Sequence, residues 1–240
     1  MQVQVISSVN EASSAQFVHK TAMIIDVLRA TSSIITALAT GSSGVIPVET
    51  VMEARTAQQE GDLLCGERFC KKIPGFDLGN SPEEFLMNAV KDRRVILTTT
   101  NGTRAIHKST RAETMLIAAL LNASACAKTA IDLRRDVVIL CAGSHDEFAI
   151  EDGLCAGLLL SRMQRLCSAP LEIDDFGLAM LSLYQDRANQ IKETILSGAT
   201  GKRLIKLGMA RDIDICSEVD TYTIVPRLQS SGDLLLCSCH

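Results

Sequence analysis

The sequence contains no tryptophan, and aromatic residues make up only 3% of its 240 positions. Proteins that bind single-stranded nucleic acid stack bases on aromatic side chains, so this shortage argues against such a platform. The net charge is −4, whereas binding to a phosphate backbone requires a basic face. The composition therefore argues against nucleic acid as a partner and favours a small molecule.

Features of a secreted or membrane protein are also missing. Residues 1–6 include no basic segment followed by a long apolar core, which a signal peptide would have. The most apolar stretch, residues 115–121, is far too short to span a bilayer. The nine cysteines are odd in number and show no paired spacing, so no disulfide framework is expected. We expect a cytoplasmic protein with no membrane partner, and we leave open whether it forms a homodimer.

Several common catalytic motifs are absent as well. No G-x-x-x-x-G-K-[ST] or G-x-G-x-x-G segment follows an expected strand, so neither a P-loop nor a dinucleotide site is indicated. Cys141 has Glu147 rather than arginine six positions later, which excludes the phosphate loop of cysteine-dependent phosphatases. Asp26 is followed two positions later by Leu28, so the paired aspartates of haloacid-dehalogenase-type phosphatases are missing too.

Short apolar runs alternate with segments of helical spacing through most of the chain. This alternation predicts an α/β fold of three αβα layers, with a largely parallel or mixed sheet and the active site at the C-terminal ends of its strands. Residues 1–240 are expected to form a single domain, or two closely packed lobes with a boundary near residues 120–135. Strands are expected near residues 3–5, 22–25, 45–48, 62–65, 95–97, 115–120, 137–141, 213–215 and 221–225.

Helix boundaries can be predicted at several places. Thr50 and Glu53 have the spacing of a capping box, which opens a helix expected to run to about Gly61. Ser81 and Pro82 have the arrangement of an N-cap followed by the first helical residue. In the last third of the chain, residues 174–197 carry helical spacing, and a short helix is expected at residues 202–207.

Polar residues gather directly after four of the expected strands. The strand at residues 22–25 ends on Asp26, and Arg29, three hydroxyl residues and a helix start follow it. Comparable turns follow residues 65, 97 and 141. Because the carboxyl ends of parallel strands meet at one edge of a sheet, we expect the four turns to build one site.

The side chains in these turns fall into three chemical groups. Oxygen-only acids suit a hard cation such as Mg²⁺, whereas guanidinium forks suit phosphate, sulfonate or carboxylate. Together they predict a site for a small polyanion with Mg²⁺, in which phosphoryl chemistry depends on positioning and charge neutralisation. The acids are Asp26, Glu67, Asp77, Glu151 and Asp152; the cations are Arg29, Arg68 and Arg104; and the neutral hydrogen-bonding residues are Thr31, Asn80, Ser81, Thr99, Thr100, Asn101, Thr103 and Ser144.

Some of these residues also have a purely structural interpretation. Glu151 and Asp152 could complement the dipole of the helix that they begin. Asp77 and Asn80 could be ordinary turn residues. His145, which follows Ser144, is interpreted as a surface loop residue.

The ordered motifs resemble the 2-phosphosulfolactate phosphatase (ComB-like) family over essentially the whole chain. The segments Gly-Phe-Asp-Leu-Gly-Asn-Ser-Pro at residues 75–82 and Thr-Thr-Asn-Gly-Thr at residues 99–103 are the most specific. One departure is Cys65 before Gly66-Glu67, where the family pattern has glycine. The other matching segments are residues 26–31, 66–68, 121–123, 141–143 and 151–157.

The resemblance implies hydrolysis of 2-phospho-3-sulfolactate to 3-sulfolactate and phosphate, a step on the route to coenzyme M, with Mg²⁺ as cofactor. Two alternatives stay open: a phosphatase for a related 2-phospho-hydroxyacid, and a non-catalytic anion-binding protein. The sequence leaves open whether water or a carboxylate attacks, and which acids contact the metal. On this basis the expected catalytic residues are Asp26, Arg29, Glu67 and Arg68; the expected metal ligands are Asp26, Glu151 and Asp152; and the expected substrate-binding residues are Thr31, Asp77, Asn80, Ser81, Thr99, Thr100, Asn101, Gly102, Thr103 and Ser144.

Overall fold

The computed structural model describes residues 1–86, 88–145, 147–228 and 236–239. Its strands are β1 (Gln2–Ile6), β2 (Thr21–Ile25), β3 (Gly44–Pro47), β4 (Leu63–Arg68), β5 (Lys71–Lys72), β6 (Arg94–Thr98), β7 (Thr114–Ala118), β8 (Val137–Cys141), β9 (Glu172–Ile173), β10 (Val225–Leu228) and β11 (Leu236–Cys239). Its α-helices are α1 (Ala30–Ala39), α2 (Val51–Ala57), α3 (Pro82–Leu86), α4 (Gly102–Lys108), α5 (Ala123–Asp132), α6 (Ile150–Leu166), α7 (Asp175–Arg187), α8 (Ile191–Ser197), α9 (Ala199–Lys206) and α10 (Ala210–Cys216).

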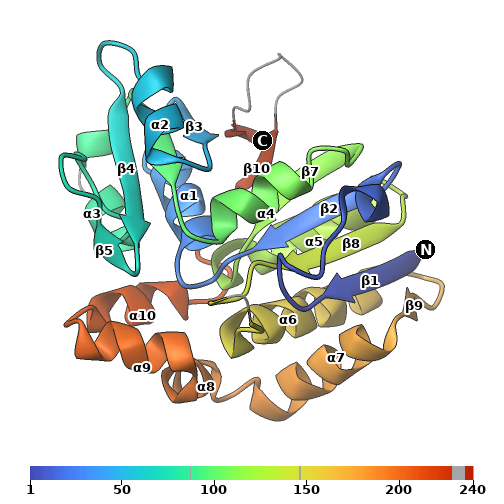
Figure 1. The fold of residues 1–240 in the computed structure, drawn as a ribbon. Coiled ribbons are helices and arrows are strands. Elements are labelled where there is room, and N and C mark those ends of the chain that lie inside the picture. The colour runs from blue at the N-terminus through green and yellow to red at the C-terminus, as the bar shows by residue number, and fades with distance from the viewer. Residues whose placement is uncertain (87, 146, 229–235, 240) are drawn as a thin grey trace.

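The strands form a mixed sheet in the order β5-β4-β6-β3-β11-β10-β7-β2-β8-β1-β9 (Figure 1). Two groups of parallel strands, β4-β6-β3 and β7-β2-β8-β1, are joined through the antiparallel pair β10 and β11. Helices cover the sheet, so the predicted α/β class and its three-layer arrangement are confirmed.

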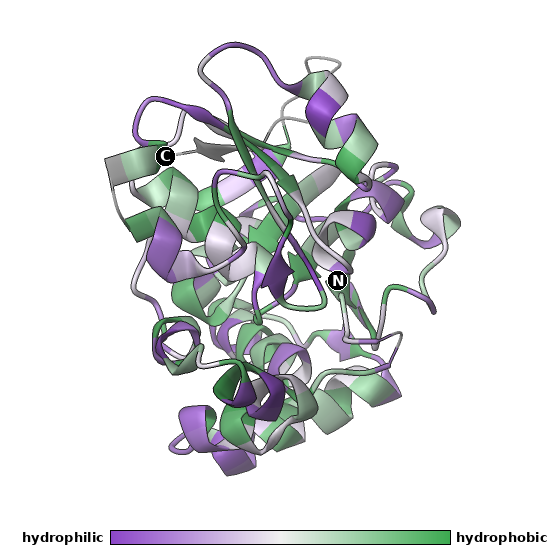
Figure 2. Ribbon diagram, turned by 60° about the vertical axis from the view of Figure 1, so that its left-hand side comes forward, coloured by the Kyte–Doolittle hydropathy of each residue, from purple (hydrophilic) through white to green (hydrophobic). Residues whose placement is uncertain are grey.

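Strand β2 shows why the sheet is covered on both faces. Successive side chains of a strand point to opposite faces, and all five residues of β2 are buried. Met23 and Ile25 belong to a core cluster with residues of α5 and α6, whereas Ala22 and Ile24 belong to a second cluster with residues of α1 and α4. Figure 2 shows the same arrangement, with hydrophobic colouring along the central strands. This two-sided burial explains why the strand is a continuous apolar run.

The register brings strand ends together within each group of parallel strands. Ile25, the last residue of β2, pairs with Ala118 at the end of β7 and with Cys141 at the end of β8. In the other parallel group, Gly66 of β4 pairs with Thr98 at the end of β6. Within each group, the strands therefore end at one edge. The antiparallel strands β10 and β11 make the two groups run in opposite directions, and the Asn101 amide, which donates to the Gly143 carbonyl at 3.0 Å, shows that the turns after β6 and β8 nevertheless meet.

Most of the expected strands between residues 3 and 141 are present, but the last third of the chain differs from expectation. The strand expected at residues 213–215 was wrong, because these residues belong to α10. The alternation of Asp212, Ile213, Asp214 and Ile215 imitates a strand, yet α10 buries Asp212, Ile213 and Cys216 together. The strand expected at residues 221–225 begins only at Val225.

Three other boundaries also differ. The helix that opens at Thr50 ends at Ala57 rather than near Gly61, because the Asp62 side chain accepts the Gln59 N–H at 2.8 Å and forms a turn. Residues 174–197 form two helices, α7 and α8, instead of one. Strand β4 continues through Arg68, so the expected turn residues 66–68 are its last three positions.

The C-terminal helices lie across the end of the sheet where these turns meet. Helix α10 packs on α3, and α9 packs on α8 and α10 (Figure 1). The helices α9 and α10 therefore add residues to a site that the strands alone would leave open.

Among the described residues, no helix has the length and apolar character needed to cross a membrane.

Candidate active site

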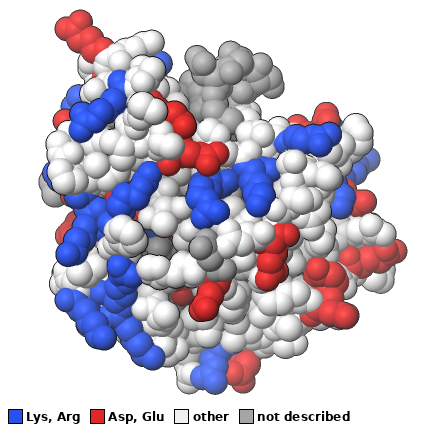
Figure 3. Space-filling view, viewed as in Figure 1, with Lys and Arg blue, Asp and Glu red and all other residues white. Residues whose placement is uncertain are grey.

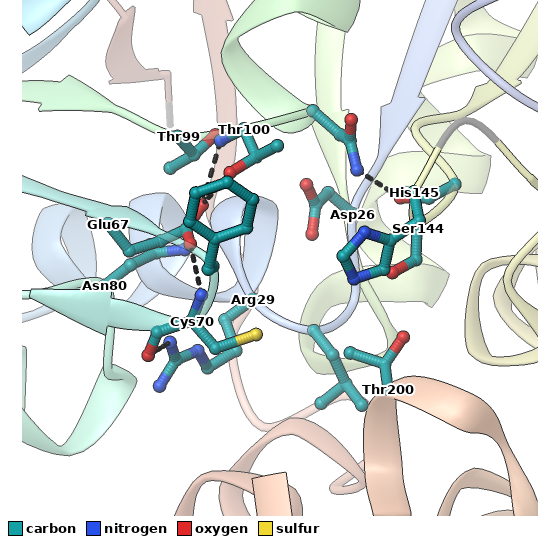
Figure 4. Close-up of a pocket in the computed structure, with 14 residues that line it drawn as sticks. Asp26, Arg29, Glu67, Cys70, Asn80, Thr99, Thr100, Ser144, His145 and Thr200 are labelled. Carbon is teal, nitrogen blue, oxygen red and sulfur yellow. Dashed lines mark hydrogen bonds between the residues drawn. The ribbon is translucent and has the colours of Figure 1, made fainter. Parts of the chain in front are cut away.

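A cavity of about 50 Å³ lies where the strand ends meet. Residues from all four expected polar turns line it, and α9 and the segment before α3 add one residue each. Figure 4 shows Asp26 near its centre, with Glu67 and Asn80 on one side and Ser144 and His145 on the other. The lining residues are Asp26, Leu28, Arg29, Glu67, Phe69, Cys70, Asn80, Thr99, Thr100, Asn101, Gly143, Ser144, His145 and Thr200.

Eight of the expected site residues are among them, and eight are not. Those that line the cavity are Asp26, Arg29, Glu67, Asn80, Thr99, Thr100, Asn101 and Ser144. Those that do not are Thr31, Arg68, Asp77, Ser81, Gly102, Thr103, Glu151 and Asp152.

Asp26 is the buried carboxylate at the end of β2. Its Oδ1 accepts the Ala30 N–H at 3.1 Å, at the start of α1, and its main chain is tied to the Thr31 hydroxyl by two hydrogen bonds. Burial raises its pKa to about 7, and the negative charges of Glu67 and Glu151 add to the increase. The turn thus holds a carboxylate whose charge the surrounding protein does not balance.

Gly102 gives Asp26 its space. A Cβ atom at this position would lie 2.6 Å from Asp26 Oδ2 and 2.4 Å from the Ala30 Cβ. Such approaches are far inside van der Waals contact, so only glycine lets the first turn of α4 pack against the carboxylate. Gly102 therefore shapes the cavity without lining it.

Glu67 joins two of the turns. Its Oε1 accepts the N–H and the hydroxyl of Thr100 at 2.8 and 2.9 Å, and its Oε2 accepts the Cys70 N–H at 2.7 Å (Figure 4). Hydrogen bonds to a carboxylate are stronger than those between neutral groups. The side chain therefore orders the turns after β4 and β6 around the cavity.

Arg29 lines the cavity, but its charge is balanced within the protein. Its Nη1 donates to Asp212 Oδ2 at 2.5 Å, and its Nη2 donates to the Cys70 carbonyl at 3.1 Å. The Ser81 hydroxyl donates to the other oxygen of Asp212 at 2.5 Å. Asp212 was missed in the sequence, because an acid inside an apparent strand of the last third gave no signal.

The two acids at the start of α6 do not line the cavity, and Glu151 lines an adjoining hollow instead. Asp152 accepts the N–H of Val27 at 2.8 Å and of Gly143 at 3.0 Å, so both of its oxygens serve the turns after β2 and β8. Burial raises the pKa of Asp152 and of Glu151. Within the described residues, no three His, Cys, Asp or Glu side chains are placed to hold a metal ion. Asp26 is the expected metal ligand that lines the cavity.

Several other expected residues support the turns. Arg68 donates to the carbonyls of Glu67 and Glu49 and to the Thr98 hydroxyl, at 2.8–2.9 Å. Asp77 is exposed and accepts the Leu64 N–H at 2.8 Å, which fits the turn-residue interpretation. Thr103 exchanges hydrogen bonds with Thr99 in the buried turn before α4, and Arg104 contacts Asn10 at 3.0 Å.

Asn80 is the expected residue whose surroundings most directly indicate a ligand. The residue is 4% exposed, and its Oδ1 has no hydrogen-bond partner in the described structure. Buried polar atoms are nearly always satisfied, so this oxygen calls for a donor from a bound molecule or water.

Four lining residues with side chains suited to contact a ligand were not predicted: Phe69, Cys70, His145 and Thr200. Phe69, Cys70 and His145 have φ values of 56°, 65° and 52°. This left-handed backbone conformation is uncommon for residues other than glycine and could not be predicted from their identity. For His145, the position after Ser144 in the fourth turn was a usable signal. Burial, followed by the charge of Glu67, raises the pKa of the Cys70 thiol, so it is poorly suited to act as a nucleophile.

A family model described as 2-phosphosulpholactate phosphatase matches residues 7–231. A protein of Thermotoga petrophila named probable 2-phosphosulfolactate phosphatase is 40% identical over 209 residues, which cover 87% of this chain and 89% of the relative. A protein of the same name from Symbiobacterium thermophilum is 40% identical over 232 residues, covering 95% and 99%. Another, from Clostridium acetobutylicum, is 38% identical over 242 residues, covering 98% and 100%.

Proposed function

This chain belongs to the 2-phosphosulfolactate phosphatase family, and on that premise we propose that it hydrolyses 2-phospho-3-sulfolactate to 3-sulfolactate and phosphate with the help of Mg²⁺. The relatives' names support the substrate and the class of phosphoric monoester hydrolases. The observation that carries the proposal in this chain is the unbalanced carboxylate of Asp26 in a cavity lined by hydroxyl and amide groups.

Charge supports the inclusion of a divalent cation. Asp26 and Glu67 line the cavity, Glu151 lines the adjoining hollow and its charge acts on Asp26, and Arg29 is neutralised by Asp212. A substrate with phosphate, carboxylate and sulfonate groups would be repelled by these acids unless a cation accompanied it. The donor set fits Mg²⁺, because this ion prefers oxygen ligands and needs only one or two carboxylates besides water and phosphate oxygens.

Asp26 is the residue proposed to hold the ion. Its Oδ1 is fixed by the Ala30 N–H, and its Oδ2 lies in the space that Gly102 leaves. When bound, Mg²⁺ would neutralise the charge on the phosphoryl oxygens. Asp152 positions the turns after β2 and β8 through its two backbone contacts, so its proposed role in the metal site is indirect.

The remaining lining residues would bind and orient the substrate. Thr99, Thr100 and Asn101 come from the turn that leads into α4, and the Asn101 amide donates to the Gly143 carbonyl at 3.0 Å. This contact fixes the turn after β6 against the turn after β8. Asn80 offers the free acceptor described above, which would receive a hydrogen bond from a water molecule or a protonated ligand group.

A panel of phosphate esters tests the proposal. Phosphate release would be measured from 2-phospho-3-sulfolactate, 2-phospholactate and 2-phosphoglycerate, each with and without Mg²⁺. The proposal predicts the highest kcat/KM for the sulfolactate ester. A higher value for another ester would assign the enzyme to that hydroxyacid, and binding of all three without release of phosphate would indicate an anion-binding protein.

A further inference from the structure

Arg203 does not line the cavity itself, but it contacts two residues that do. It lies on α9, one turn after Thr200, which lines the cavity and is 6% exposed. Its Nη1 contacts His145 Nε2 at 2.5 Å, and its Nη2 donates to the Phe69 carbonyl at 3.3 Å. One side chain thus links α9 to two of the turns that form the site.

The charge of Arg203 is not balanced by these contacts. Its partners are an imidazole nitrogen and a carbonyl oxygen, and no carboxylate of the described residues forms an ion pair with it. Arg29, the arginine deeper in the cavity, is by contrast neutralised by Asp212. The field of Arg203 also reaches the cavity, where it opposes the increase in the pKa of the Cys70 thiol that burial causes.

Arg203 also fixes the hydrogen-bonding state of His145. A guanidinium can only donate, so Nε2 of His145 must be the acceptor in this contact. The neutral imidazole then carries its proton on Nδ1 and keeps one N–H donor for another partner. A second hollow of about 360 Å³ shares Ser144, His145 and Thr200 with the cavity, but Glu147 and Glu151 also line it, so an anion would lie on the cavity side of His145.

The surrounding surface is basic although the whole chain is acidic. Figure 3 shows Lys and Arg side chains gathered over β5 and α9. The exposed lysines of these elements are Lys71, Lys72, Lys202 and Lys206. Such a rim attracts anions and raises their local concentration.

We propose that Arg203 and His145 form a subsite for the second oxyanion of the substrate, the sulfonate or carboxylate group that is not removed. The proposal rests on the proposed phosphatase function and adds the residue that selects among phosphate esters. Arg203 supplies the charge and a planar set of N–H donors, and the His145 N–H supplies a neutral donor. The Thr200 hydroxyl donates to the Glu151 carboxylate and so helps to hold α9 beside the cavity. The phosphate would lie deeper, beside Asp26.

Kinetics of three esters test the subsite. 2-Phospho-3-sulfolactate carries both acidic groups, 2-phospholactate lacks the sulfonate, and 2-phosphooxyethanesulfonate lacks the carboxylate. Arg203→Met is expected to lower kcat/KM by about 10- to 100-fold for the esters that carry the recognised group, the range for hydrogen bonds to charged groups. The ester without that group should change by less than about threefold. The unaffected ester identifies whether sulfonate or carboxylate is bound.

Two further variants separate the hydrogen-bonding geometry of the Arg203 guanidinium from its positive charge. Lys206→Met removes one positive charge from the same helix and should leave the preference among the esters unchanged. Arg203→Lys keeps the charge but loses the planar donor geometry of the guanidinium. Its preference among the three esters, measured by kcat/KM, should lie between those of wild type and Arg203→Met. An equal loss on all three esters, or no loss, would overturn the proposal.

Binding of the product gives a readout that does not depend on turnover. Calorimetric titration with 3-sulfolactate should show a Kd about 10-fold higher for Arg203→Met than for wild type, and less than about a twofold increase for Lys206→Met, which makes only a screened long-range contribution. If wild type releases no phosphate from any ester, the proposed function fails while this comparison still decides the subsite. An unchanged Kd in Arg203→Met would contradict the subsite even in an active phosphatase.

Discussion

Arg29 and Asp212 form a buried ion pair, with Nη1 2.5 Å from Oδ2 and both side chains 3% exposed. The pair connects the turn after β2 to α10, two segments 183 residues apart in the chain. It fixes the guanidinium at the cavity wall, and it explains why α10 belongs to the site although no residue of α10 lines it. The pair also makes a prediction about stability.

Asp212→Ala is expected to lower the free energy of unfolding by about 3–5 kcal/mol, because it leaves Arg29 as an unpaired buried charge. Urea unfolding would measure the loss. Asp214→Ala on the same helix is the matched control, since Asp214 pairs with Lys192 at the surface, and it should cost about 0–1 kcal/mol. Similar losses in the two variants would show that Arg29 does not depend on its partner.

Arg29→Lys is predicted to be a damaging change although it keeps the charge. Arg29 contacts Asp212 and the Cys70 carbonyl through two different nitrogens, which a single ammonium cannot reproduce. We expect kcat/KM to fall by an amount equal to about 1.5–3 kcal/mol of transition-state stabilisation. An unchanged kcat/KM in steady-state assays would mean that Arg29 has no part in binding or orienting the substrate.

Turnover is predicted to require a divalent cation, with Mg²⁺ preferred because the groups around Asp26 are oxygen donors. Chelation with EDTA should abolish phosphate release, and added Mg²⁺ should restore it. Full activity after exhaustive dialysis against EDTA would show that the reaction needs no divalent cation. Asp26 would then act without a metal ion.

The stability of the metal-free protein is predicted to fall as the pH rises through the acid-to-neutral range. The pKa of Asp26 is about 7 in the folded protein, against an ordinary value of 3.8, so between these values the folded state holds a proton that the unfolded state has released. Folding stability then decreases with rising pH, by up to about 1.4 kcal/mol per pH unit from this group.

Urea unfolding at several pH values in EDTA would measure this slope. Asp26→Asn cannot bind or release that proton, so its curve should be flatter over the same range. Addition of Mg²⁺ should oppose the decline in wild type, because the ion binds the deprotonated carboxylate. Parallel curves for wild type and Asp26→Asn would contradict the raised pKa.

The position of the site was predictable because its main residues follow buried strands. Asp26, Thr99, Thr100 and Ser144 all occur within three residues of an apolar run, and such positions meet at one edge within each group of parallel strands. The meeting of the two groups was not predictable, because the antiparallel strands β10 and β11 lie between them. The sequence alone could not distinguish a side chain that enters the cavity from one that supports it. Asp152 is an example, because its two backbone partners lie 125 and 9 residues away.

The contribution of the last third of the chain was not predictable. Alternating acids and isoleucines at residues 212–215 have the period of a strand, and the helix forms because its buried face packs against α3 and α9. Thr200 and Arg203 reach the site only through that packing. The spacing of apolar residues indicates the period of a segment. It does not show which other elements will pack against that segment in the folded protein.

Phosphate release by Asp26→Asn decides whether the carboxylate at the end of β2 is essential for turnover. The substitution keeps the shape of the side chain but removes the charge that a cation needs, so turnover of 2-phospho-3-sulfolactate with Mg²⁺ should be lost almost completely in a folded protein. Cys141→Ser is the control, because this thiol is fully buried with a raised pKa, and the variant should lose some stability while keeping its activity. The measurement is kcat and Tm for both variants. The predicted result is an inactive but folded Asp26→Asn beside an active Cys141→Ser. An active Asp26→Asn would contradict the proposed role of this carboxylate.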